Sequence, residues 1–160
     1  MGDGTSIRHQ FQFLIGTDNI LRSVRVQIRK VGSPTDNVEC RVMDMDRTTV
    51  IAVSTTSILS SNLSANFQES AFVFNDVVLT PNQRYIIDIR RSSSNSATNH
   101  YEIEANGTNF YPYGQLHYFD GTNWIAYSGC LRFAIQMGFN HEMGKWRLSD
   151  NDYESTSQVD

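Results

Sequence analysis

The chain has few of the features that mark nucleic-acid-binding or membrane proteins. Only two of its 13 basic residues are lysines, Lys30 and Lys145, and the net charge is −4. Nucleic-acid-binding domains usually carry a basic excess, so we predict no nucleic-acid partner. No apolar run approaches the roughly 18 residues that a membrane-spanning helix needs, so we predict no membrane partner either.

Cysteine is also scarce, and the two cysteines permit at most one disulfide bond. Cys40 shares the alternation of the apolar residues Val38 and Val42, whereas Cys130 falls out of phase with the apolar run that begins at Leu131. A disulfide requires Cα atoms within about 7 Å and converging Cβ vectors, which opposite phases disfavour. We therefore predict two free thiols, as in a chain that folds in a reducing compartment.

Catalytic motifs are missing from the sequence. The histidines His9, His100, His117 and His141 are scattered, and no serine lies in a Gly-x-Ser-x-Gly elbow. The stretch HEMGK begins like a zinc-protease helix, but Lys145 stands where the second histidine should be. The phosphate-binding P-loop and the dinucleotide-binding glycine pattern are absent as well. We predict that the protein is not an enzyme.

What the sequence does contain is a repeated alternation of apolar and polar residues. From Val24 to Met45, two such runs, VRVQIR and VECRV, flank the segment GSPTDN. A period of two is that of a half-buried β-strand, and glycine, proline, aspartate and asparagine favour turns. We predict an antiparallel hairpin over residues 24–45, with one apolar face that another layer must cover.

Similar short runs recur over the first 138 residues and predict about nine strands without a helix. Beyond the hairpin, they cover residues 7–15, 48–54, 69–74, 85–90, 101–103, 115–119, 124–127 and 130–137. This pattern is typical of an all-β fold, an antiparallel sandwich or barrel. We predict a single domain over residues 7–138, preceded by a flexible N-terminal leader.

Residues 139–160 differ in composition from the rest of the chain. They hold five acidic residues against two basic ones. Their apolar residues Phe139, Met143, Trp146 and Leu148 could dock as a short arm, and the composition beyond Ser149 favours disorder. We predict that this acidic C-terminal arm serves assembly and not the fold.

The aromatic segment NFYPYGQLHYFDGTNW is the best candidate for a contact site. Two of its tyrosines flank a proline in a loop that we expect to be exposed. Such rings beside amide groups suit a sugar, which stacks on the ring and bonds through its hydroxyls, and they suit a subunit contact equally well. The predicted ligand or subunit contact residues are His100, Asn109, Tyr111, Tyr113 and Asn123. We expect Trp124, at the end of the segment, to fill the core.

Several of these motifs occur in the same order in a known group of domains. They are the opening QFQF, the run SVRVQIRKVGSPTDNVECRV, the turn and strand VVLTPNQRYIIDI, the hairpin YGQLHYFDGTNW and the closing CLRFAIQM. Over about Gln10 to Gly138 the chain resembles jelly-roll β-sandwich modules of tailed-phage structural proteins and of bacterial surface and carbohydrate-binding proteins. The resemblance implies an antiparallel jelly-roll β-sandwich, while function depends on sites grafted onto that shared fold.

The resemblance also suggests a structural calcium ion, because modules of this type often bind one through carboxylate and carbonyl oxygens. Asp18, Asp36 and Asp120 lie in predicted turns and are the candidate ligands. Turn chemistry explains each of these residues equally well. The residues by themselves therefore predict no metal site.

These observations lead to an expected function and one alternative. We expect a non-enzymatic phage structural module, a capsid decoration or a tail-fibre component, that contacts its own subunits or other virion proteins. The start MGDGTSIRHQ has neither the charged leader nor the apolar core of a signal peptide, which favours a virion protein assembled in the host cytoplasm. The alternative is a carbohydrate-binding module of a secreted bacterial protein, acting outside the cell on a surface glycan.

Overall fold

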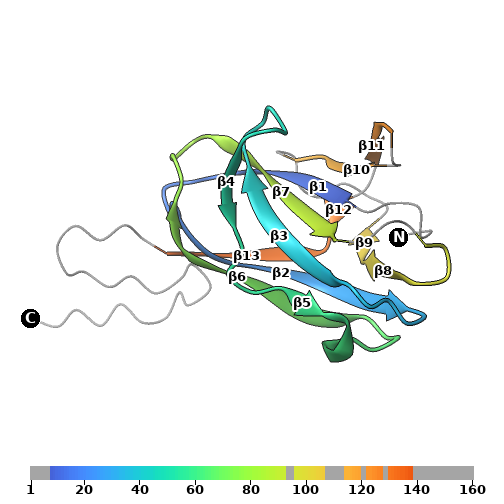
Figure 1. Ribbon diagram of the computed structural model, residues 1–160. Helices are drawn as coiled ribbons and strands as arrows, with labels where there is room; N and C mark the ends of the chain where they lie inside the picture. Colours follow the sequence, from blue (N-terminus) through green and yellow to red (C-terminus); the bar gives the residue numbers. More distant parts are fainter. Residues whose placement is uncertain (1–7, 93–95, 107–113, 120–121, 128–129, 139–160) are drawn as a thin grey trace, which may run out of the picture.

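The computed structural model describes residues 8–92, 96–106, 114–119, 122–127 and 130–138, which form β-strands and one short 3-10 helix (Figure 1). The elements are β1 (Arg8–Leu14), β2 (Ile20–Val31), β3 (Asn37–Met43), β4 (Val50–Val53), β5 (Ile58–Leu59), η1 (Ser60–Asn62), β6 (Gln68–Val78), β7 (Arg84–Arg91), β8 (His100–Ile103), β9 (Ala105–Asn106), β10 (Leu116–Phe119), β11 (Trp124–Tyr127), β12 (Cys130–Leu131) and β13 (Phe133–Gly138). No described helix has the length and apolar character needed to cross a membrane. The predicted all-β class is confirmed.

The strands form two antiparallel sheets that pack against each other (Figure 1). The large sheet has the strand order β11-β10-β1-β7-β3-β4, with β5 also paired to β3. The small sheet has the order β13-β2-β6, with β8 also paired to β2, and β9 pairs with β12 in a separate two-stranded piece. The predicted antiparallel β-sandwich is confirmed at this level, while its jelly-roll topology stays a prediction.

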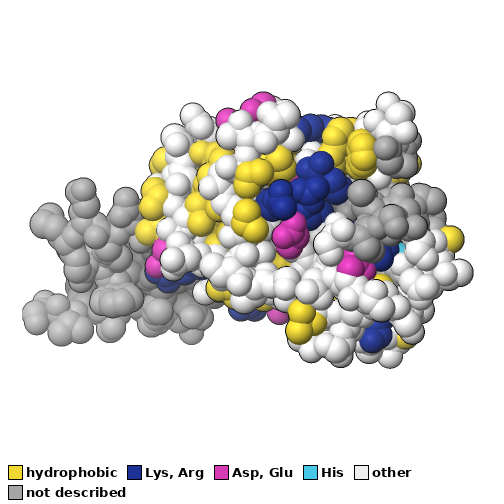
Figure 2. Space-filling model, viewed as in Figure 1, with side chains coloured by type: hydrophobic (Ala, Val, Ile, Leu, Met, Phe, Trp, Pro, Cys, Tyr) yellow, Lys and Arg dark blue, Asp and Glu magenta, His cyan; other side chains and the backbone are white. Residues whose placement is uncertain are grey.

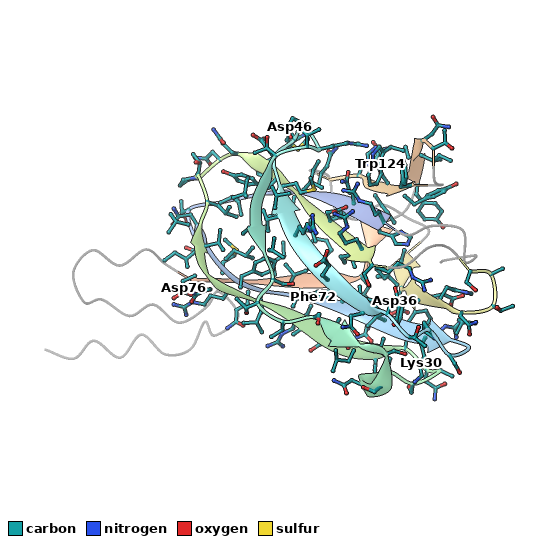
Figure 3. All side chains as sticks on the ribbon, viewed as in Figure 1. Lys30, Asp36, Asp46, Phe72, Asp76 and Trp124 are labelled. Carbon is teal, nitrogen blue, oxygen red and sulfur yellow. The ribbon has the colours of Figure 1, made fainter. Side chains whose placement is uncertain are left out.

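The hydrophobic core lies between the two sheets and is filled by alternate residues of their strands. Phe11 and Phe13 of β1 are buried from the large sheet, and Phe72 of β6 is buried from the small one (Figure 3). The ring centroids of Phe11 and Phe133 lie 4.4 Å apart, which joins β1 to β13 across the core. Burial of such apolar surface, at roughly 25 cal/mol per Å², is the main force that holds the two sheets together.

The predicted hairpin over residues 24–45 is wrong, although the predicted apolar faces are right. Strands β2 and β3 belong to different sheets, since β2 pairs with β6, β8 and β13 whereas β3 pairs with β4, β5 and β7. Val24 on β2 and Cys40 on β3 are both fully buried. The chain between the strands crosses from one sheet to the other, because this arrangement buries both apolar faces against each other.

The crossing segment depends on a glycine. Gly32 has a φ of +68°, a left-handed conformation that favours glycine. A Cβ atom at this position would lie 2.1 Å from the carbonyl oxygen of Thr98. The backbone amide of the next residue, Ser33, donates a 2.7 Å hydrogen bond to the side chain of Asn99. Residues 32–33 are therefore held against residues 98–99, which fixes where the chain leaves β2.

Candidate functional site

The predicted aromatic contact site falls largely outside the described residues, where Asn109, Tyr111 and Tyr113 lie. His100 begins β8 in the small sheet and is buried, with its Nε2 atom 3.4 Å from a carboxylate oxygen of Glu102. Asn123 is exposed and directly precedes β11 at the edge of the large sheet. The two described members thus belong to different sheets, and the proposed contact role of the five residues stays a prediction.

Among the predicted metal ligands, Asp36 has a defined partner in the structure. Its carboxylate accepts hydrogen bonds of 2.8 and 2.9 Å from the guanidinium of Arg91, and both side chains are buried. Tyr101 donates to the backbone carbonyl of Asp36. Asp18 is partly buried, and Asp120 lies outside the described residues. Within the described part of the chain, no group of three or more histidine, cysteine or acidic side chains is arranged to hold a metal ion.

The Asp36–Arg91 pair lies at one end of the sandwich, beside a small cavity. The cavity has a volume of about 20 Å³ and is lined by residues of both sheets, among them His9, Arg91 and Tyr101. This volume holds about one water molecule. As the described residues line it, this cavity beside the buried ion pair therefore has no room for a larger ligand.

One flank of the sandwich has the character of a contact surface. Strand β4 ends the large sheet and, among the described strands, pairs only with β3; β6 ends the small sheet on the same side (Figure 1). The chain just after β4 is tied to β6, because the Thr55 amide donates a 2.7 Å hydrogen bond to the Val73 carbonyl. The Val73 amide in turn donates to the Thr56 hydroxyl at 3.0 Å. These bonds occupy the outer edge of β6 at Val73. No described strand pairs with the outer edge of β4.

The same flank collects the exposed apolar side chains. Among the described residues, the large hydrophobic side chains that are exposed all come from the β3–β4 turn, β4, β5 and β6. They are Met45, Val50, Ile51, Val53, Leu59, Val73 and Val78. Figure 2 shows hydrophobic atoms gathered over this side of the molecule. We call the seven residues the β4–β6 flank; such grouped apolar exposure is typical of interaction sites.

Strand β4 itself lacks the usual protection of an edge strand. Natural edge strands commonly carry lysine, proline or inward-pointing charges that prevent pairing with another chain. The sequence of β4 is VIAV, three β-branched residues and an alanine, and Val53 is the most exposed of them at 47%. Its backbone groups and side chains are therefore suited to pairing with a further strand.

Trp124 does not fill the core, contrary to expectation, but lies half-buried on the outer face of the large sheet (Figure 3). Its indole is 5.2 Å from the ring of Phe119, its cross-strand neighbour. The guanidinium carbon atoms of Arg8 and Arg47 lie 5.0 and 5.4 Å from the indole centroid. Alternation in the sequence did not predict the outward position of Trp124, because that position depends on how β11 pairs with β10.

Comparison with known proteins finds no family model that matches the chain and no curated protein with significant sequence similarity.

Proposed function

We propose that the protein is a non-enzymatic structural module that assembles through the β4–β6 flank, as a capsid decoration or tail-fibre component of a tailed phage. The observation that carries this proposal is the uncharged outer edge of β4, which pairs with no further described strand, within a flank that holds seven exposed apolar side chains. The resemblance of the sequence motifs to jelly-roll phage modules supports the virion setting.

The partner that best fits this edge is a second copy of the same chain. Two β4 strands related by a twofold axis run antiparallel and extend the large sheet from one copy into the next, with backbone hydrogen bonds between them. Val50 and Val53 pair in register with Met43 and Arg41, so they share the outer face of the large sheet. In the dimer, the valines of both copies come together on this face and bury apolar surface that each monomer exposes.

A charge placed on the edge tests this proposal. In Val53→Lys, the new ammonium group would need to be desolvated in the contact, so we expect the oligomer to dissociate while the monomer stays folded. The matched control is Ala134→Lys, an exposed position on β13 at the opposite edge of the small sheet. Light scattering on the full-length chain gives the mass of each variant.

The expected outcome is an oligomer for the wild type and for Ala134→Lys, and a monomer for Val53→Lys. A monomeric wild type at high concentration would contradict assembly by the chain alone. An oligomer that survives Val53→Lys would show that the contact lies elsewhere on the molecule.

A further inference from the structure

The outer face of the large sheet carries an unusual line of side chains beside Trp124. Cross-strand pairing aligns one residue from each of five adjacent strands, and paired residues point to the same face. In the order β11, β10, β1, β7 and β3, the line is Trp124, Phe119, Arg8, Arg90 and Glu39. Two aromatic rings are thus followed by two cations and a carboxylate.

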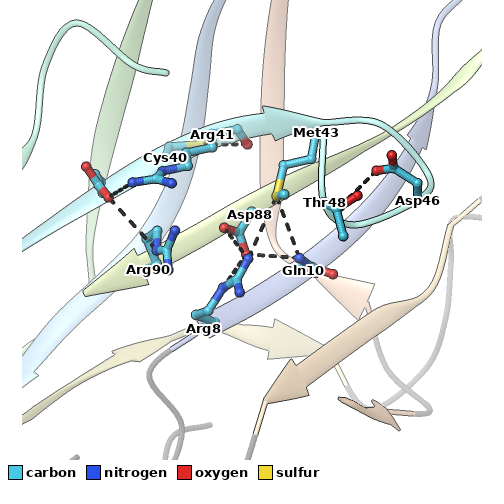
Figure 4. Close-up of polar contacts among 10 residues, drawn as sticks. Arg8, Gln10, Cys40, Arg41, Met43, Asp46, Thr48, Asp88 and Arg90 are labelled. Carbon is cyan, nitrogen blue, oxygen red and sulfur yellow. Dashed lines mark hydrogen bonds and ion pairs between the residues drawn. The ribbon is translucent and has the colours of Figure 1, made fainter. Parts of the chain in front are cut away.

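Positive charge exceeds negative charge on this face. Arg8 and Arg90 are direct cross-strand neighbours, a like-charged pair that is unfavourable by itself. Arg41 and Arg90 share the carboxylate of Glu39, at 2.7 and 3.9 Å (Figure 4). Burial, followed by the charge of Arg8, lowers the pKa of Arg90. Figure 2 shows basic side chains gathered here between hydrophobic atoms.

Arg47 adds a fourth cation, and the β3–β4 turn holds it in place. The Asp46 carboxylate accepts 2.8 Å hydrogen bonds from the amides of Thr48 and Thr49, which close the turn. Figure 4 shows Asp46 beside Thr48. Arg47 has a φ of 62°, a conformation that is uncommon for a residue other than glycine. Its guanidinium lies over the indole of Trp124. No carboxylate or other acceptor among the described residues bonds to it, so its N–H donors are available to a ligand.

A second line of residues, directly beside the first, holds buried polar atoms that lack partners. It runs through His117, Gln10, Asp88 and Arg41 on adjacent strands. The Asp88 carboxylate accepts from Arg8 at 3.0 Å and from Gln10 at 3.2 Å. His117 Nδ1, Gln10 Oε1 and Arg41 Nε are buried and have no hydrogen-bond partner among the described residues. Buried polar atoms are nearly always paired, so a water molecule or a ligand group is expected at each of these atoms.

The unpaired atoms are of both hydrogen-bonding kinds. Gln10 Oε1 is an acceptor, and it is free because the amide nitrogen of the same side chain donates to Asp88. Burial, followed by the charge of Arg47, lowers the pKa of His117 and so favours the neutral ring, which has one donor and one acceptor nitrogen. Arg41 Nε is an unpaired donor, and the guanidinium of Arg47 supplies further donors on the same face. A fitting ligand therefore carries both hydroxyl groups and an anionic group.

We propose that this face binds an acidic saccharide, with its carboxylate or sulfate on the guanidinium groups of Arg47 and Arg8 and a sugar ring against the exposed part of Trp124. Both Gln10 Oε1 and His117 Nδ1 are buried, so sugar hydroxyls would reach them only after neighbouring side chains shift. Aromatic stacking with charge-assisted hydrogen bonds is the chemistry that such a ligand requires. The site uses residues other than the β4–β6 flank, so the inference does not depend on assembly.

Calorimetric titration of the full-length protein with defined probes tests this site. The probes are a galacturonate hexamer, which carries carboxylates, a heparin hexasaccharide, which also carries sulfates, and neutral maltohexaose. We expect one or both acidic probes to bind and maltohexaose not to bind, and the preferred acidic probe distinguishes carboxylate from sulfate. Inorganic sulfate and a single-stranded oligothymidylate complete the series.

Arg47→Gln is the deciding variant, because its side chain bonds to no described acceptor and its loss should leave folding intact. Removing charge-assisted hydrogen bonds should weaken binding of the acidic probe by about tenfold or more. The matched control is Arg22→Gln, which removes the same charge from an exposed arginine on β2, paired with Asp76 in the small sheet. This variant should bind as the wild type does, and thermal melting of both variants confirms that they fold.

Several results would overturn the proposal. If neither acidic probe binds, the proposed site does not exist. If Arg47→Gln and Arg22→Gln weaken binding of the acidic probe equally, the binding is nonspecific electrostatic attraction. Inorganic sulfate that binds as tightly as the saccharides would show a simple anion site. Tighter binding of the oligothymidylate would assign the face to nucleic acid instead.

Discussion

Arg8 and Asp88, 80 residues apart in the chain, form an ion pair of 3.0 Å on the outer face of the large sheet, with the carboxylate fully buried. A carboxylate on the outer face of a sheet is ordinarily hydrated, but this one lies beneath arginine, glutamine and methionine side chains (Figure 4). The pair keeps Arg8 beside Trp124 and offsets the repulsion between Arg8 and Arg90.

Removing the Asp88 carboxylate should therefore destabilise the folded protein. We expect Asp88→Asn to lower the free energy of unfolding by about 3 kcal/mol, because the loss of one partner leaves a partly buried charge uncompensated. Urea unfolding measures this change. The control is Glu69→Gln, which breaks the exposed pair of Arg25 and Glu69 and should cost less than about 1 kcal/mol. Equal effects of the two substitutions would mean that Asp88 has no special role.

Gly32 provides a test of the crossing between the sheets. We expect Gly32→Ala to destabilise the fold by more than about 1 kcal/mol, because it combines a positive φ with a close approach to the Thr98 carbonyl. Gly16→Ala is the matched control, since a Cβ atom there meets nothing within 4 Å. Thermal denaturation compares the two variants, and a Gly32→Ala protein as stable as Gly16→Ala would show that the crossing segment adapts.

The buried thiol of Cys40 should be unreactive in the folded protein. Burial, followed by the charges of Asp88 and Glu39, raises its pKa well above the ordinary value, so the reactive thiolate is scarce at neutral pH. Cys40 is a free cysteine, and we expect Cys130 to be free as well. Mass spectrometry after alkylation without reductant should find Cys40 unlabelled in native protein and both cysteines labelled in denaturant. Labels that appear only after reduction would instead indicate a disulfide bond.

The β3–β4 turn should lose the hydrogen bonds of the Asp46 carboxylate at low pH. Hydrogen bonds from the Thr49 hydroxyl and from the amides of Thr49 and Thr48 lower the pKa of Asp46 far below its ordinary 3.8. A lowered pKa means that the carboxylate supports the turn fully above about pH 4, and that this support is lost as the pH falls toward the folded-state pKa. NMR titration of the Thr48 and Thr49 amides should therefore give a midpoint below 3.8. A midpoint at the ordinary value would show that the capping bonds do not persist in solution.

Residues 139–160, which lie outside the described residues, provide a test of the predicted domain boundary. The described strands close at Gly138, and the final segment is acidic with few apolar residues. Removal of residues 139–160 should leave a cooperative melt nearly unchanged while it weakens oligomerisation. A truncated chain that fails to fold would make the segment part of the sandwich and the domain boundary wrong.

The sequence predicted the faces of the strands better than their partners. Alternation in Val24, Val26 and Ile28 depends on neighbours along one strand, and all three are buried as predicted. Pairing depends on contacts far apart in sequence, and no local signal distinguished a hairpin from a crossing between sheets over residues 32–36. Turn-forming residues serve either connection.

The proposed saccharide site on the outer face of the large sheet could likewise be predicted only in part from the sequence. Asp88 and Arg90 alternate with the buried Ile87 and Ile89 on β7, so the sequence does indicate a charged outer face. It does not indicate that β1 brings Arg8 opposite Arg90, or that the β3–β4 turn brings Arg47 to Trp124. These relationships arise from strand register and turn geometry, which become visible only once the sheets are formed.

The central claim, that β4 pairs with a second copy, is tested most directly by hydrogen exchange measured across protein concentrations. If β4 pairs in the oligomer, the amides of residues 50–53 should exchange more slowly as the concentration rises through the dissociation range. The amides of β13, at the opposite edge of the small sheet, should not change. Exchange in β4 that stays equally fast at every concentration, while light scattering reports an oligomer, would contradict the account.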